Sequence, residues 1–268
     1  MPSYASAADF TYDRSFTAIG LSLTTPGGST PPTAHLDQAS PAIGLDFTAA
    51  TRTYRARYND ASITVVTQPT VTAVPTTAGS VPTDIYSNGP ISFLRSPVVL
   101  LANNTSNQPT SATYIGYIKW VDQERVRYQL FGARTVPANI PTQNPGRLPL
   151  THPGSCMVTV ISKTGQQTEY ATISGVTIDF RTNQVQGGAN WDQTTGLGGF
   201  AIDGVLDSTT GRISGTASVP RFDGKPSDST GSFEGALFGF SYSEVALLVT
   251  ISNPDGSLLY GLIGWTAQ

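Results

Sequence analysis

The side chains that most often do chemistry at neutral pH are scarce in this chain. It has two histidines, His35 and His152, and one cysteine, Cys156. A zinc site built from these types would have to recruit all three, and their spacing matches no known zinc motif. Haem needs only one or two axial ligands and an apolar slot. We expect His35 in a long Pro/Thr loop, either as a haem-capturing ligand or as an exposed loop histidine, and His152 in a linker.

The other reactive types point away from catalysis. Cys156 has apolar or small neighbours, which favours a buried strand thiol over a nucleophile. Serines and aspartates are abundant, but no Gly-x-Ser-x-Gly elbow follows a strand and precedes a helix. Asp207 and Asp255 lie in turn sequences, where aspartate is favoured for backbone reasons. The sequence therefore predicts no catalytic residue and no enzyme, with a β-rich hydrolase as the remote alternative.

Five aromatic residues lie close together in the chain. They are Tyr114, Tyr117, Trp120, Tyr128 and Phe131. Alternation along a strand would group Tyr114 with Trp120 and place Tyr117 on the opposite face. Two interpretations stay open. The aromatic residues can form a handle-domain core or a handle–barrel interface, or they can form part of a recognition surface, because Tyr and Trp are common at protein interfaces. The candidate ligand-binding residues are therefore His35, Tyr114, Tyr117 and Trp120, with His35 as the metal ligand if haem is bound.

Composition narrows the class of protein. The 268 residues include 27 Gly and 19 Pro but only 12% charged residues, a profile typical of turn-rich β structure. The net charge of −3 and the lack of a basic tract argue against a nucleic-acid partner. No 18-residue apolar segment predicts a membrane span. No signal peptide is visible, so we expect either a cytoplasmic protein or a chain that begins after a removed signal, and the Ser/Thr-rich start fits the second.

The C-terminal part divides into eight short β-like runs separated by turn sequences. They are Met157–Lys163, Ser174–Phe180, Gln184–Trp191, Gly199–Asp207, Arg212–Val219, Gly231–Gly239, Glu244–Asn253 and Leu258–Ala267. Eight consecutive strands with short turns predict an up-and-down antiparallel barrel, which closes on itself and removes exposed edges.

The first part also has β-like runs, but long polar connections separate them. The runs are Phe10–Tyr12, Phe16–Leu23, Ile43–Phe47, Thr53–Tyr58, Ser62–Thr67, Ile91–Leu94, Val98–Leu101, Thr113–Val121 and Arg127–Gly132. We expect long external loops at Thr24–Pro32 and Thr67–Pro82, where binding residues are common. The Pro/Gly-rich segment Thr135–Pro153 is the clearest linker, and it predicts a division into residues 1–147 and 148–268.

The end of the chain resembles a known family. Gly231-Ser-Phe-Glu-Gly-Ala-Leu-Phe-Gly239, followed by a Glu-containing turn and a final hairpin, is similar to the closing strands of the transferrin-binding protein B-like surface lipoproteins. Further similar segments are Tyr128–Thr135, Leu148–Gly154, Gly175–Phe180 and Ile213–Ala217. The resemblance covers the last 140 residues. The chain departs from the family pattern in three ways. It has Phe240 where the family commonly has Pro, and it has one handle–barrel unit where the two-lobed receptors have two. It also lacks the lipid-bearing cysteine that family members usually carry near the mature N-terminus.

The resemblance implies an all-β protein with an N-terminal β-rich handle domain and a C-terminal eight-stranded antiparallel β-barrel. It implies a non-enzymatic ligand-binding monomer that is extracellular or on the outer-membrane surface. Its cargo would be iron or haem, or a host or environmental protein, and its partners a TonB-dependent receptor and an outer-membrane export partner. No cofactor other than haem is expected. A structural or adhesive surface module without small-molecule cargo is the alternative, because abundant Ser/Thr and long loops fit it equally well.

Overall fold

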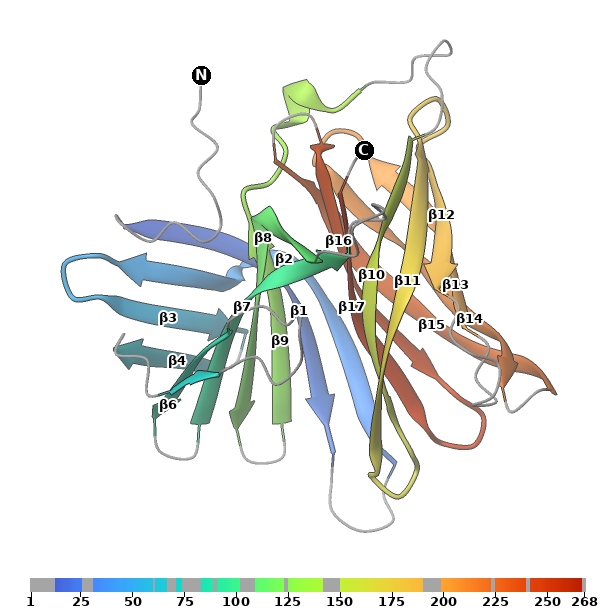
Figure 1. The fold of residues 1–268 in the computed structure, drawn as a ribbon, viewed down its shortest axis with the longest axis horizontal. Coiled ribbons are helices and arrows are strands. Elements are labelled where there is room, and N and C mark those ends of the chain that lie inside the picture. Colours follow the sequence, from blue (N-terminus) through green and yellow to red (C-terminus); the bar gives the residue numbers. More distant parts are fainter. Residues whose placement is uncertain are drawn as a thin grey trace.

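The protein folds into two antiparallel β-structures that lie side by side (Figure 1). The computed structural model describes residues 13–25, 31–59, 61–66, 71–73, 83–88, 91–101, 109–122, 125–141, 150–189, 199–222, 225–239 and 242–266. Within these ranges all regular elements are strands except one 3-10 turn, η1 (Pro137–Asn139). The predicted all-β class, with a handle followed by an eight-stranded barrel, is confirmed.

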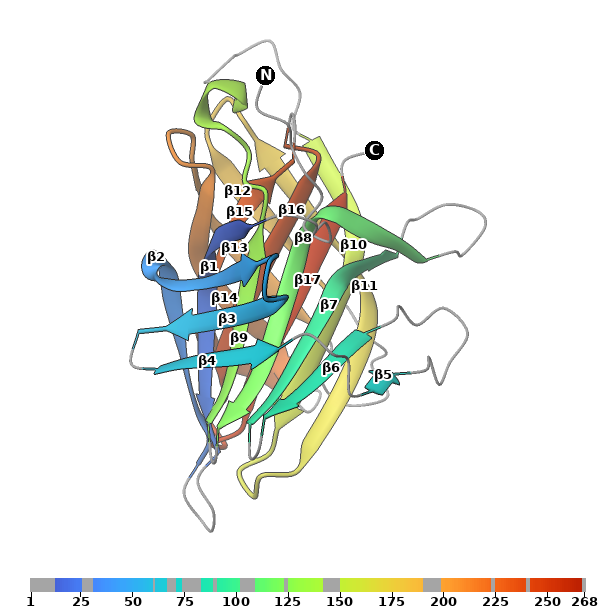
Figure 2. The ribbon, with the colours of Figure 1, turned by 90° about the vertical axis from the view of Figure 1, so that its left-hand side faces the viewer.

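The handle is a nine-stranded sheet in the order β4-β3-β2-β1-β9-β8-β7-β6-β5. Its strands are β1 (Arg14–Thr24), β2 (Thr33–Thr48), β3 (Thr53–Tyr58), β4 (Ala61–Val66), β5 (Val71–Ala73), β6 (Thr83–Asn88), β7 (Ile91–Leu101), β8 (Pro109–Asp122) and β9 (Arg125–Gly132). The first and last strands pair in the middle, from Ala18 opposite Phe131 to Thr24 opposite Arg125. The sheet therefore consists of two meanders joined at β1 and β9, and Figure 2 shows them spreading to either side.

The handle differs from the sequence prediction in several places, among them the strand β6, which no predicted run covers. His35 lies within β2, opposite Ser22 of β1, so its predicted position in a loop is wrong: the long β1 offers a ladder that draws the Pro/Thr-rich segment into the sheet. Two predicted runs merge into β7, with a register shift between Pro97 and Val99. The short strand β5 lies inside the predicted loop Thr67–Pro82, and the predicted run Phe10–Tyr12 lies outside the described residues.

The barrel closes between its first and last strands, β10 and β17. Its strands are β10 (Leu150–Ile161), β11 (Gln167–Asp179), β12 (Gln184–Ala189), β13 (Phe200–Asp207), β14 (Arg212–Phe222), β15 (Lys225–Phe238), β16 (Glu244–Ser252) and β17 (Leu258–Thr266). His152 lies in β10 opposite Val176, so its predicted place in a linker is wrong. The predicted division at residues 147 and 148 lies outside the described residues and stays a prediction.

Apolar side chains fill the barrel. Phe233, Leu237, Val249 and Ile251 all belong to one buried cluster inside it. The ring of Phe233 lies over a backbone pair made of Gly204 and Gly215, where an added Cβ would come within 2.7 and 2.9 Å of the ring. Glycines on adjacent strands thus make room for the largest side chains of a small barrel.

A second apolar layer joins the outside of the barrel to the handle. Leu248 and Ala246 of β16 point away from the barrel interior and pack with handle residues such as Leu21 and Leu130. Because the handle covers its outer face, β16 is buried on both faces over Glu244–Ile251. A strand buried on both faces has a continuous apolar sequence instead of an alternating one. We call this layer the seam.

Residues 133–141, which follow β9, run along the barrel rim (Figure 1). Thr135 donates its backbone N–H to the carbonyl of Leu237 and its hydroxyl to the carbonyl of Gly239. Ile140, just after η1, is 4% exposed and packs into the barrel core. This connection therefore fixes the handle to the barrel at a second place, above the seam.

Candidate functional site

A partly open cavity of about 160 Å³ lies in the seam between handle and barrel. Its walls come from both parts of the molecule. The handle provides Leu21, Tyr117, Lys119 and Tyr128, and the barrel provides Thr159, Glu169, Leu248, Tyr260, Gly261 and Leu262. The cavity therefore exists only when the handle is seated on the barrel.

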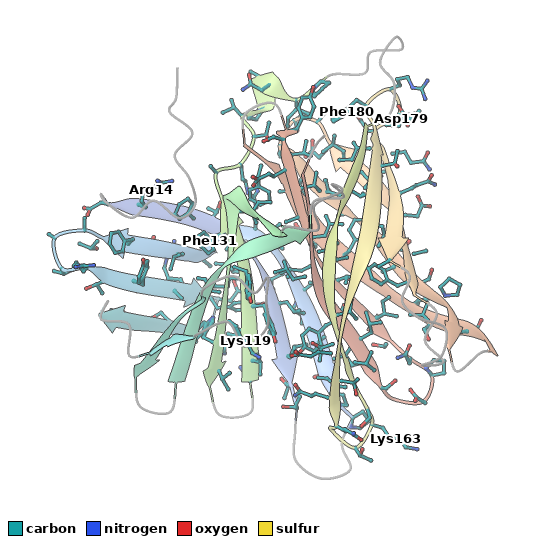
Figure 3. The ribbon with its side chains drawn as sticks, in the orientation of Figure 1. Arg14, Lys119, Phe131, Lys163, Asp179 and Phe180 are labelled. Carbon is teal, nitrogen blue, oxygen red and sulfur yellow. The ribbon has the colours of Figure 1, made fainter. Side chains whose placement is uncertain are left out.

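Strand alternation decides which handle residues reach the cavity. On β8, Tyr117 and Lys119 face the barrel, whereas Ile118 and Trp120 face the separate core of the handle. On β9, Tyr128 faces the barrel and stands directly opposite Lys119 in the register. The ammonium of Lys119 lies 5.5 Å from the centre of the Tyr128 ring, a cation–π distance. Figure 3 labels Lys119 on β8 and Phe131 on the neighbouring β9.

One tyrosine of the handle and one of the barrel bring their hydroxyls together at the cavity. The hydroxyl of Tyr128 lies 3.2 Å from that of Tyr260, and their rings are 5.5 Å apart at an interplanar angle of 46°. Tyr260 is 6% exposed. Burial raises the pKa of Tyr128 well above its usual range, and the neighbouring Tyr260 adds to this effect. Tyr128 therefore keeps its phenol proton at physiological pH, and a tyrosine hydroxyl can both donate and accept a hydrogen bond.

Opposite charges stand at the edge of the cavity. Lys119 is half-buried and Glu169 is exposed. No ion pair joins either of them to another residue in the described part of the chain. The cavity thus combines apolar walls with one cation, one anion and four side chains that carry a hydroxyl, Tyr117, Tyr128, Thr159 and Tyr260.

The volume limits what can enter. A cavity of about 150 Å³ is known to hold one benzene molecule, whereas drug-sized ligands occupy roughly 300–1,000 Å³. The seam cavity is therefore of the size that holds one six-membered ring, and it is smaller than the usual pocket for a larger ligand.

The four sequence-predicted binding residues are not brought together. Tyr117 lines the cavity, while Trp120 is 1% exposed and lies in the handle core under the guanidinium of Arg127. His35 is on β2 with its side chain 78% exposed and its Nε2 3.4 Å from Asp37. Tyr114 lies in β8, and its side chain is outside the described part. The predicted opposite faces of Tyr117 and Trp120 are confirmed.

Sequence reasoning missed Lys119 and Tyr260 as members of the site. Lys119 alternates with two buried aromatic or aliphatic neighbours, a pattern that could have placed it beside Tyr117. Tyr260 is 132 residues from Tyr128, and no local pattern links them.

The described residues contain neither a metal-ligand cluster nor a membrane-spanning helix. No group of three His, Cys, Asp or Glu side chains there is arranged to hold a metal ion. Within the same ranges no helix has the length and hydropathy needed to span a bilayer.

Comparison with known proteins supports the fold. No protein-family model matches the chain, and no curated protein matches it in sequence. Among solved structures, transferrin-binding protein B isotype 1 from serogroup B Neisseria meningitidis aligns with a TM-score of 0.55 at 10% identity, covering 94% of this chain and 43% of that one. This chain thus spans less than half of that protein's length.

Two further solved structures are similar over almost the whole chain. A transferrin-binding protein B double mutant from Haemophilus parasuis has a TM-score of 0.45 at 8% identity, with 96% of this chain and 76% of that one covered. The haemoglobin receptor HpuA from Kingella denitrificans has a TM-score of 0.48 at 16% identity, with 100% and 90% covered.

The handle sheet, the closed barrel and the seam between them define an all-β handle-and-barrel lobe. With the meningococcal alignment, the fold is that of a transferrin-binding protein B-like lobe.

Proposed function

We propose that this chain is a non-enzymatic binding protein of a bacterial surface that captures a host protein carrying iron or haem. The observation that supports this most is the handle-and-barrel fold, shared over 94% of the chain with a protein named for binding transferrin. The lining of the seam cavity contains no Ser–His or Cys–His pair that could act as nucleophile and base.

The handle is the proposed contact surface for the captured protein. The barrel interior is filled with apolar side chains, and the seam cavity admits only one ring. The strands β2 and β3, in contrast, carry exposed polar side chains, among them His35 and Arg55. A sheet presents its side chains on a backbone that is already ordered, so binding does not have to order that backbone.

Haem would reach the chain inside its carrier protein. The seam cavity, of about 160 Å³, is smaller than the pockets that hold larger ligands, and the His35 side chain is 78% exposed, whereas haem binding needs an apolar slot beside its axial ligand. We propose direct haem ligation by His35 only as the lesser route. Tyr114 remains a candidate contact of the handle, whereas Trp120 serves the handle core.

The cellular setting is proposed on the same basis. The chain would work as a monomer, outside the cell or on the outer-membrane surface. An outer-membrane export partner would bring the chain there, and the chain would pass its cargo to a TonB-dependent receptor. The alternative of a purely adhesive module predicts no preference for iron or haem proteins.

Co-elution on size exclusion tests the proposal. The purified chain is mixed with human transferrin and, separately, with human haemoglobin, with serum albumin as the control. We expect a stable complex with one of the first two and none with albumin. Failure of both to co-elute at micromolar concentration would contradict protein capture and leave the adhesive module.

A further inference from the structure

The seam cavity has the properties of a ligand site that protein capture does not use. Its walls are apolar, its volume of about 160 Å³ matches one aromatic ring, and its polar groups are of three distinct kinds. We propose that this cavity binds a free aromatic amino acid of the tyrosine type, that is, a zwitterion with a phenol ring.

The ring is assigned to the apolar part of the cavity. Leu21, Leu248 and Leu262 provide aliphatic walls from β1, β16 and β17. Tyr128 and Tyr117 add aromatic surface, and aromatic pairs gain about 0.5–1.5 kcal/mol beyond the burial of their area. A single ring therefore fills the space with apolar contact on several sides.

The hydroxyl is assigned to the tyrosine pair. The two hydroxyls lie 3.2 Å apart, so one donates to the other and each still has hydrogen-bonding capacity. A phenol ligand can join this pair as a third member. L-Phenylalanine cannot, so we expect it to bind about five- to tenfold more weakly than tyrosine.

The charged head group is assigned to the edge of the cavity. Lys119 can bind the ligand's carboxylate and Glu169 its ammonium, and neither has an ion-pair partner among the described residues. One cation and one anion beside an apolar slot complement the two charges of a zwitterion. A ligand with a single charge would leave either Lys119 or Glu169 without an opposite charge.

Fluorine NMR with 3-fluoro-L-tyrosine tests the site on the whole chain. We expect saturable line broadening, with Lys119→Met and Glu169→Gln each weakening binding about tenfold. Lys119→Met should leave 3-fluorotyramine, which lacks the carboxylate, unaffected. The matched control is Lys163→Met, an exposed lysine in the turn between β10 and β11, which should change nothing.

Three results would overturn the assignment: no broadening at the solubility limit of the probe, equal affinity for a fluorinated p-cresol that lacks both charges, or equal affinity for a peptide with an internal tyrosine. The edge variants test the site without changing the buried tyrosine pair. The site is independent of protein capture, since NMR reports on the cavity whether or not the chain co-elutes with transferrin or haemoglobin.

Discussion

Tyr128 of the handle and Tyr260 of the barrel meet with their hydroxyls 3.2 Å apart and their rings 5.5 Å apart. This is a contact between residues 132 positions apart in the sequence. It lies within the apolar seam, where Leu21 and Leu248 also come from opposite sides. The pair is therefore a direct reporter of whether the handle is seated on the barrel.

Removing either hydroxyl should weaken the seam. We expect Tyr128→Phe and Tyr260→Phe each to lower the free energy of unfolding by about 1 kcal/mol, because each leaves a buried hydroxyl without its partner. The double variant should lose less stability than the two single variants lose when their effects are added, and the difference is a coupling energy of about 0.5–1 kcal/mol. Urea unfolding measures all four proteins. Tyr54→Phe in the handle core is the control, and it should show no coupling to Tyr260.

Stability should fall at alkaline pH because of Tyr128. Burial raises its pKa in the folded state above the usual 10.0. As the pH rises, the unfolded chain loses this proton before the folded chain does. The contribution of Tyr128 to the free energy of unfolding is therefore fully present below about pH 10 and is lost as the pH rises beyond it. In unfolding experiments between pH 9 and 12, the free energy of unfolding should fall less steeply with pH for Tyr128→Phe than for the parent chain. Equal slopes for the two proteins would mean that Tyr128 ionises as freely when folded as when unfolded.

The closing strand motif should not tolerate a methyl group at its central glycine. A Cβ at Gly235 would lie 2.0 Å from Leu247 Cδ2 and 2.3 Å from the carbonyl oxygen of Ala246. We expect Gly235→Ala to lower the free energy of unfolding by about 1–3 kcal/mol through overpacking. Gly175→Ala is a matched control in the same barrel, since nothing lies within 4 Å of its added Cβ. Thermal unfolding of the two variants should differ clearly, and a similar effect at both sites would contradict the packing described.

Acid should weaken the turn after β11. Hydrogen bonds from Arg181, of 2.9 Å from Nε and 2.6 Å from Nη2, lower the pKa of Asp179 to about 2. The folded-state pKa is thus below the ordinary 3.8, so this group stabilises the fold above about pH 4 and ceases to do so as the pH falls towards 2. NMR titration of the carboxyl carbon measures this pKa directly. In Arg181→Gln it should return towards 3.8.

The barrel could be predicted from the sequence because its strands are short, consecutive and separated by turns. All eight predicted runs overlap observed strands, and Gly231–Gly239 ends where β15 does, within one residue. The apolar run of β16 also predicts a strand, but nothing local says that its second face meets a handle. That information lies in the pairing of distant elements.

The handle and the cavity were harder to predict for physical reasons. His35 follows two prolines, and only the ladder of β1 makes its segment a strand. Tyr117 was predicted as a binding residue and does line the cavity, because alternation on β8 follows from backbone geometry alone. Tyr260 and Glu169 come from the other domain, and their position depends on how handle and barrel dock.

Surface plasmon resonance tests the central claim most directly. The chain is immobilised, and iron-loaded transferrin, iron-free transferrin, haemoglobin and serum albumin are passed over it. The account predicts saturable binding to transferrin or to haemoglobin and none to albumin. Equal responses to all four proteins, or no response to any at micromolar concentration, would contradict capture of an iron- or haem-carrying protein.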